Sequence, residues 1–273
     1  SSLCFDEFHP YIPLHYWDHE SVPFLNKWMP RLTTMGVKES RLSILSGYGA
    51  LDLPSVVFEA ESLKHLRVEH LYVKAVEKIA LCKHLRSLHL VGVSIDDSIV
   101  GKIIAGCPLI ETLCVNGFNI GLRTIKMNDL RNLKDFTFTV FNGGDPLCSI
   151  EIDPLSLETV KISAANITFR RGADFRNLKD LYLRGVNSSL DNLSFSKFPR
   201  LKSLTLSDCD GLKESRILID APNILYFEYQ GDFVPSVSFA TNSNEWKSEI
   251  RIAYVIGIPT TNNVSSLICG SSN

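Results

Sequence analysis

A short hydrophobic pattern recurs along most of this chain. In its clearest copy, Phe198–Cys209, the residues Leu201, Leu204 and Leu206 follow the spacing L-x-x-L-x-L. The last two leucines alternate with polar residues, which predicts a short strand with one buried face. Apolar pairs of this kind stand at ten places whose first members are 21 to 25 residues apart: Leu42/Ile44, Leu66/Val68, Leu88/Leu90, Leu113/Val115, Phe136/Phe138, Val160/Ile162, Leu181/Leu183, Leu204/Leu206, Phe227/Tyr229 and Ile250/Ile252.

A third apolar position precedes the pair in most copies. It lies three residues before the first member of the pair: Leu63, Leu85, Ile110, Leu133, Leu157, Leu178, Leu201 and Ile224. About eighteen residues then remain to bring the chain back and start the next strand beside the first, in the same direction. One such turn cannot bury its apolar side alone, so each turn needs stacked neighbours. The pattern therefore predicts a coil of parallel strands.

The limits of the pattern predict three regions. Residues 1–37 form an N-terminal cap, residues 38–230 the repeat array, and residues 231–273 a degenerate last repeat with a C-terminal tail. Within the cap, a capping helix interrupted by Pro30 is indicated by apolar residues at helical spacing: Val22, Leu25, Trp28, Met29 and Leu32.

The segments that join the predicted strands differ from one another. Leu71–Ala80 and Asp96–Gly106 have the spacing of amphipathic helices. Asn142–Pro146 is typical of a turn, and Asn166–Phe175 of an extended segment. We therefore expect a convex side of mixed helix and loop.

Composition limits the possible function. The chain has 28 basic and 30 acidic side chains and a formal charge of -2, so no overall attraction to nucleic acid or to an anionic membrane follows. No apolar run approaches the roughly eighteen residues of a spanning helix. The seven cysteines are odd in number and form no C-x-x-C pair, which favours reduced thiols in the cytoplasm or nucleus over a disulfide framework.

The residues between the paired apolar positions, and a second row one position after each pair, should line the open, concave face of the sheet. This mostly polar surface suits a protein partner, and arginine and aromatic side chains are the strongest anchors in such contacts. The alternative is that each is an ordinary solvated strand residue. The candidate protein-binding residues are Arg67, His89, Asn116, Lys161, Tyr182, Arg184 and Glu228.

Sites for catalysis, metal or cofactor are not expected. His65, His84 and His89 are not at ligand spacing with each other or with Cys82. Asp96 and Asp97 are better explained as charges at the start of a helix. Similar reasoning places Cys107 and Cys114 in the core or in a strand, and no glycine-rich segment has the setting of a phosphate loop. We therefore predict a protein that is not an enzyme.

Four motifs resemble a known family. The spacing is that of leucine-rich repeats, and Gly106–Leu113 is similar to the GCP-x-LE-x-L form in plant F-box/LRR-repeat proteins. Ala221–Gly231 resembles their APNL-x-x-F-x-Y-x-G segment. Trp28 followed by Gly36–Glu39, and Leu53–Leu63, resemble the segments that lead into their first repeats. The similarity extends over about residues 24–239, and no F-box is recognised in residues 1–35.

This resemblance implies both a fold and a function. The fold would be an α/β leucine-rich-repeat solenoid of the ribonuclease-inhibitor-like horseshoe kind, with a parallel concave sheet. The function would be target recognition for an SCF-type ubiquitin ligase. A Skp-type adaptor would be a partner only if the full-length protein carries an F-box. Two alternatives remain: a binding scaffold without a link to ubiquitin, and a small-molecule-sensing receptor.

Overall fold

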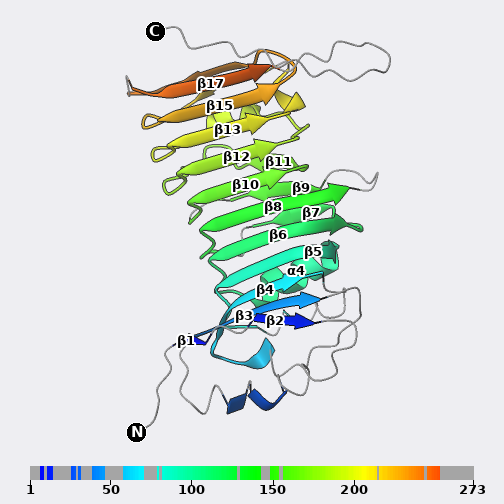
Figure 1. Cartoon of the computed structure of the whole chain (residues 1–273). Helices are drawn as coiled ribbons and strands as arrows, with labels where there is room; N and C mark the ends of the chain where they lie inside the picture. The colour runs from blue at the N-terminus through cyan, green and yellow to red at the C-terminus, as the bar shows by residue number, and fades with distance from the viewer. Residues whose placement is uncertain are drawn as a thin grey trace, which may run out of the picture. The chain divides into compact units, whose positions relative to one another are not determined.

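Parallel strands dominate the computed structural model of this chain (Figure 1). Two units are distinguished, Ser1–Cys148 and Ser149–Asn273. The structure describes residues 7–8, 11–14, 26–28, 30–31, 39–46, 58–70, 79, 82–127, 130–142, 148–153, 156–213, 215–242 and 245–252.

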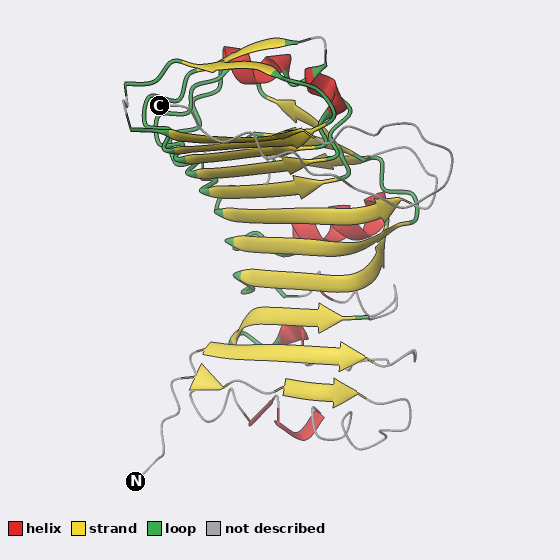
Figure 2. Ribbon diagram, turned by 45° about the horizontal axis from the view of Figure 1, so that its top comes forward, coloured by secondary structure: helices red, strands yellow, loops and turns green. Residues whose placement is uncertain are grey.

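In the first unit, one parallel sheet has the order β1-β3-β4-β5-β6-β8, and β2 also pairs with β3. A helix, α4, follows β5 and lies behind the sheet (Figures 1 and 2). The elements are β1 (Glu7–Phe8), β2 (Tyr11–Leu14), β3 (Glu39–Ser46), β4 (Leu63–Glu69), β5 (Ser87–Ile95), α4 (Asp97–Gly106), β6 (Thr112–Asn119), β7 (Thr124–Lys126) and β8 (Asp135–Asn142).

In the second unit, the main parallel sheet has the order β10-β12-β13-β15-β17. Two further parallel pairs, β9 with β11 and β14 with β16, and two short 3-10 helices belong to the connecting segments. The elements are β9 (Ser149–Ile152), β10 (Thr159–Ser163), β11 (Asn166–Phe169), β12 (Asp180–Arg184), η2 (Asp191–Phe195), β13 (Ser203–Ser207), η3 (Asp210–Leu212), β14 (Arg216–Ile219), β15 (Tyr226–Gly231), β16 (Ser236–Phe239) and β17 (Lys247–Ile252).

The strand register confirms the predicted core. Leu181, Leu204 and Phe227 lie side by side on three consecutive strands. All eight aliphatic residues that precede the pairs are buried, as are Leu42 and the pair positions from Leu66 to Tyr229. The buried side chains of each strand thus cover those of the strand before it, as expected for a repeat whose single turn cannot bury its apolar side alone.

The last predicted pair is wrong by two residues. Strand β17 places Ser248 beside Phe227 and Ile250 beside Tyr229, so that Ile252 lies opposite Gly231. The ring of Phe227 is instead covered by Phe239, at 5.2 Å between ring centroids. Ile250 remains 42% exposed. Because Phe239 on β16 covers the Phe227 ring, β17 does not need an apolar residue at position 248, beside Phe227.

A recurrent turn precedes the strands, which the hydrophobic pattern did not reveal. The amide of Leu201 donates to the carbonyl of Phe198, three residues earlier, at 3.2 Å. The same bond is made by Leu63 to Ala60, Leu85 to Cys82, Ile110 to Cys107, Leu133 to Leu130, Leu178 to Phe175, and Ile224 to Ala221. The first residue of this turn is buried in every described copy except Ala60, so it is a further core position.

The connecting segments agree with the sequence where they are described. Helix α4 begins after Asp96, whose Oδ1 accepts from the amide of Ile99 at 2.8 Å, and it ends at Gly106. Strand β11 confirms the first part of the extended segment predicted at Asn166–Phe175, which then turns at residues 171–172. Of the predicted helix at residues 71–80, only Ile79 is described, and the predicted turn at 142–146 lies outside the described residues after its first member.

The N-terminal segment contains more strand than predicted. Residues 26–28 and 30–31 are helical, in agreement with the predicted capping helix, whose other residues lie outside the described ones. The strands β1 and β2, which no apolar alternation indicated, both pair with β3. The boundaries at 37 and 230 remain predictions.

A pair of neighbouring substitutions tests the register. Leu204 is fully buried, so Leu204→Asp places an unpaired charge in the core and should cost at least about 4 kcal/mol of the free energy of unfolding. Thr205 lies on the other side of the strand, beside Glu228, so Thr205→Asp should cost at most about 1 kcal/mol, through repulsion between carboxylates. Chemical denaturation followed by circular dichroism measures both, and equal losses would contradict the register.

Candidate functional site

The open face of each sheet consists of the strand side chains that alternate with the buried pairs. In the first unit, Arg67 on β4, His89 on β5 and Cys114 on β6 lie side by side in register. Asn116 lies in the neighbouring row of this face, beside Val91. The structure therefore brings the three predicted residues of this unit onto adjacent strands.

The charges on this face are modest. Arg67 Nε donates to Glu69 Oε1 at 2.6 Å, with the two side chains 48% and 25% exposed. Exposed ion pairs of this kind contribute little stability, about 0 to 1 kcal/mol, so Arg67 can exchange its partner at low cost. Burial, and then the positive charges of Arg67 and His65, lower the pKa of His89. His89 therefore carries a neutral ring that can both donate and accept a hydrogen bond.

In the second unit, Lys161 on β10, Tyr182 on β12 and Thr205 on β13 form one row, which continues to Glu228 on β15. Arg184 lies two residues after Tyr182 on the same face, exposed, with its Nε 3.6 Å from Asp208 Oδ2. Tyrosine and arginine are both enriched among the residues that dominate binding at the centres of protein interfaces.

A cluster that the sequence did not predict lies at the end of this row. The Tyr226 hydroxyl is 3.2 Å from Glu228 Oε2 and 3.2 Å from Glu249 Oε2, and it can donate to one of them at a time. Arg251 Nε donates to Glu249 Oε1 at 2.7 Å. Partial burial and then the adjacent carboxylates raise the pKa of Tyr226, so its hydroxyl stays protonated. Glu228 is thus held by neighbours on this face.

The register explains why this cluster was missed. The predicted pair Ile250/Ile252 would have placed Arg251, not Glu249, beside Glu228, whereas the structure pairs Glu228 with Glu249. A spacing of 21 residues between β15 and β17 would have indicated it. The seven candidates therefore fall into two groups: three in the first unit, on the adjacent strands β4, β5 and β6, and four in the second unit, on β10, β12 and β15, with β13 between the last two.

Cysteine chemistry is not indicated on the part of the chain that the structure describes. Cys107 is fully buried, burial raises its pKa to about 12, and its Sγ donates to the carbonyl of Ile79 at 3.3 Å. Burial likewise raises the pKa of Cys209 to about 11. These thiols stay protonated and are poor nucleophiles. Cys114 lies within β6, so the prediction that Cys107 and Cys114 are core or strand residues is confirmed.

The two acidic residues at the start of α4 have structural contacts. Asp96 caps the helix, and Asp97 Oδ1 accepts from the amides of Arg123 and Thr124 at 2.7 and 3.2 Å. Among the described residues, no three side chains of His, Cys, Asp or Glu are grouped as metal ligands. Over the same residues, no helix is long and apolar enough to span a membrane.

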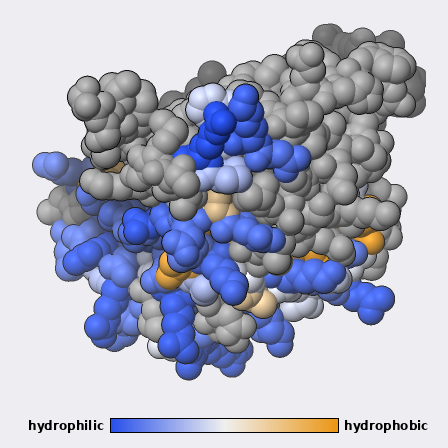
Figure 3. Space-filling model, turned by 90° about the horizontal axis from the view of Figure 1, so that it is seen from below, coloured by the Kyte–Doolittle hydropathy of each residue, from blue (hydrophilic) through white to orange (hydrophobic). Residues whose placement is uncertain are grey.

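Figure 3 views the chain from below, and the hydrophobic side chains among its coloured residues do not gather into one patch. The coloured side chains there are mainly hydrophilic, with isolated hydrophobic ones among them.

A pH dependence of stability follows from His89. Its pKa is lower in the folded chain than the ordinary 6.5, so the unfolded chain takes up the proton first as the pH falls below that value. The stability contributed by the neutral ring is present at pH 7 and lost as the pH falls through the folded pKa. His89→Gln should therefore show a smaller loss of the free energy of unfolding between about pH 7 and about pH 5 than the native chain.

Urea denaturation at both pH values measures this loss of the free energy of unfolding, with Asn116→Gln as a control that should behave like the native chain. An equal loss in His89→Gln would contradict the lowered pKa.

Comparison with known proteins agrees with the motifs. Residues 25–143 match the family model for the leucine-rich repeats of FBD-associated F-box protein At5g56370. The chain is 30% identical to FBD-associated F-box protein At5g56560 of Arabidopsis thaliana over 112 residues. The aligned region covers 40% of this chain and 26% of that protein. It is 26% identical to F-box/FBD/LRR-repeat protein At1g13570 of Arabidopsis thaliana over 111 residues. This second alignment covers 41% of the chain and 26% of that protein.

These matches span about a quarter of the length of each relative. No solved structure matches the chain significantly. The parallel strands, the stacked buried pairs and the family match together identify the fold as a leucine-rich-repeat solenoid. The resemblance is confirmed: this chain is similar to the leucine-rich-repeat region of plant F-box proteins.

Proposed function

We propose that this chain is the target-recognition region of a plant F-box protein and binds a protein through the open faces of its sheets. The observation that carries the proposal is the match of residues 25–143 to the repeats of an FBD-associated F-box protein. In this proposal the target becomes the substrate of an SCF-type ubiquitin ligase, to which a Skp-type adaptor connects an F-box of the full-length protein. The chain itself carries out no chemical reaction.

The open face of the second unit has the features that suit the main contact. Tyr182 is half-buried, so its ring is already held in place, and Arg184 beside it is exposed. A partner that covers both would bury an aromatic ring and desolvate a guanidinium without first displacing another element of the described sheet. Because ordering a side chain on binding costs free energy, a ring that is already partly buried loses less affinity to this cost.

The face also favours a partner with a mixed surface. Lys161 and Arg184 would meet acidic groups, whereas Glu228 and Glu249, which face the same side, would meet basic ones. Complementary charges of this kind orient a partner and reject those of the wrong sign. The first-unit row of Arg67 and His89 would add a second contact.

A reducing compartment fits the thiols. Cys82, Cys107, Cys114, Cys148 and Cys209 are all free. We therefore place the protein in the cytoplasm, the nucleus or both, where thiols stay reduced and where ubiquitin ligases meet their targets.

Affinity purification of the tagged full-length protein from plant cells tests the proposal. Mass spectrometry should identify a Skp-type adaptor and at least one further protein. The double variant Tyr182→Ala/Arg184→Ala should lose the further protein, with at least about a thirtyfold decrease in affinity, because each residue is an interface anchor. The adaptor should be retained.

Arg216→Ala provides a matched control, because Arg216 is an exposed arginine on β14, outside the main sheet. It should bind the target as the native protein does. Loss of the target in this control, or its retention in the double variant, would contradict the open face as the binding surface. Absence of any adaptor would contradict the link to ubiquitin and leave the scaffold alternative. A target captured only after small metabolites are added would favour the sensing alternative.

A further inference from the structure

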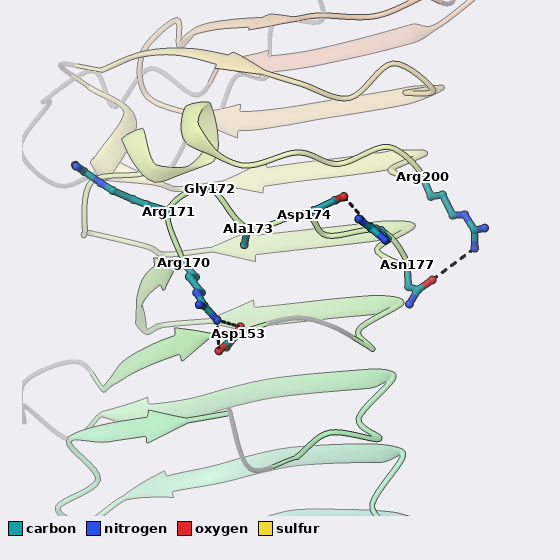
Figure 4. Close-up of a pocket in the computed structure, with 9 residues that line it drawn as sticks. Asp153, Arg170, Arg171, Gly172, Ala173, Asp174, Asn177 and Arg200 are labelled. Atoms are coloured by element: carbon teal, nitrogen blue, oxygen red, sulfur yellow. Dashed lines mark hydrogen bonds and ion pairs between the residues drawn. The ribbon is translucent and has the colours of Figure 1, made fainter.

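An arginine-lined cavity lies in the second unit, away from the open face (Figure 4). Its volume is about 700 Å³. The segment from Arg170 to Asn177, between β11 and β12, forms most of its wall. Asp153, which follows β9, and Arg200, in the turn before β13, complete it. The stacking of turns has therefore brought together charged residues from separate parts of the sequence.

Two of the arginines are paired inside the cavity. Arg170 Nη1 lies 3.0 and 3.2 Å from the two carboxylate oxygens of Asp153. Arg176 Nε donates to Asp174 Oδ2 at 2.7 Å. The side chains of Arg170 and Arg176 are still 67% and 78% exposed. Since a guanidinium has five N–H donors, each keeps donors that a ligand can reach.

Arg200 gives the cavity an excess of positive charge. Its Nη1 makes a long hydrogen bond of 3.5 Å to Asn177 Oδ1, a neutral acceptor, and Figure 4 shows the two side chains pointing toward each other. Arg171 instead lies over the ring of Phe195, 4.9 Å from its centroid, and points away from the other arginines in Figure 4. Four arginines and two aspartates line the cavity; with Arg171 held over the ring of Phe195, the other three arginines and the two aspartates leave an excess of one positive charge, in a chain whose formal charge is -2.

The single excess positive charge of the cavity matches one carboxylate better than a phosphate group. A phosphate monoester carries about -1.5 to -2 at neutral pH, whereas an acidic side chain carries one negative charge. Arginine forks bind carboxylates through two parallel hydrogen bonds. The cavity is much larger than a single carboxylate, and its arginines are on two neighbouring turns, as the backbone bridge between Asp174 and Lys197 shows. A chain segment with acidic residues fills such a cavity better than a free anion.

We propose that this cavity binds an acidic segment of a protein, with one carboxylate between Arg176 and Arg200. The inference goes beyond the proposed function, because it adds a second contact outside the open face. It depends on the proposed function in one respect, namely that the partner is a protein. The exposed arginines make the contact weak and dependent on salt, so it strengthens a complex that another surface also holds.

Fluorescence anisotropy with labelled octapeptides and the whole 273-residue chain tests the cavity directly. One peptide alternates glutamate with glycine, and its partner has glutamine at the same positions. The glutamate peptide should bind and the glutamine peptide should not. Raising the salt from about 50 to about 300 mM should weaken binding several-fold. The variant Arg176→Gln/Arg200→Gln should lose at least about tenfold in affinity, because it removes two charge-assisted contacts.

Arg216→Gln is the matched control and should leave binding unchanged. Thermal unfolding checks that every variant is folded, and Arg200→Gln alone, which breaks no ion pair with the described residues, serves if the double variant unfolds. Three results would overturn the proposal: equal binding of the glutamine peptide, native affinity in the folded arginine variants, or full competition by inorganic phosphate or free glutamate at low concentration.

The peptide test also separates this proposal from the open face. A peptide that is lost on Tyr182→Ala/Arg184→Ala but kept on Arg176→Gln/Arg200→Gln binds the open face and overturns the cavity. Loss of the purified target in the Tyr182/Arg184 variant, with peptide binding intact, would support both proposals as independent contacts.

Discussion

The lateral alignment of buried pairs on consecutive parallel strands is the constraint on which this structure depends. Leu181, Leu204 and Phe227 occupy the same position on three consecutive strands, and each side chain is shielded from water by the one on the next strand. A slip of one residue would exchange the core and the open face of a strand. The connecting segments therefore differ freely in structure, as α4 and the pairs of short strands show, provided that they return the chain in register. Once the core is aligned, the order of the side chains on the open face is fixed as well.

This constraint explains how much of the fold the sequence predicts. Period-two alternation reports burial directly, so the pairs from Leu66/Val68 to Phe227/Tyr229 and the aliphatic residue before each of them are predicted correctly. The start of the turn was not, because Cys107, Leu130, Phe198 and Ala221 share only their burial and their hydrogen bond, not a residue type. The register of β17 failed for a related reason. Ser248, which is exposed, pairs with Phe227 because Phe239 covers the Phe227 ring from another strand, a contact that no local alternation encodes.

The candidate surfaces show the same division. Residues such as Arg67, His89 and Tyr182 were placed on the open face because alternation assigns a side of the strand. The contacts among Tyr226, Glu228 and Glu249 were not predicted, because they depend on the register between strands. The arginine cavity depends on stacking between turns, which sets Arg200 beside Asn177 although 23 residues separate them. Sequence thus indicates which side chains are available, and three-dimensional register decides which of them act together.

Hydrogen exchange in the native chain, followed by mass spectrometry, tests the stacking account most directly. In the second unit, β12, β13 and β15 each have strands on both sides, whereas β17 stands at the end of the described sheet. If each turn is stable only through its neighbours, the amides of β12, β13 and β15 exchange together through one slow opening, and those of β17 exchange faster. Exchange of the three inner strands at unrelated rates, or protection of β17 equal to that of β13, would contradict the account.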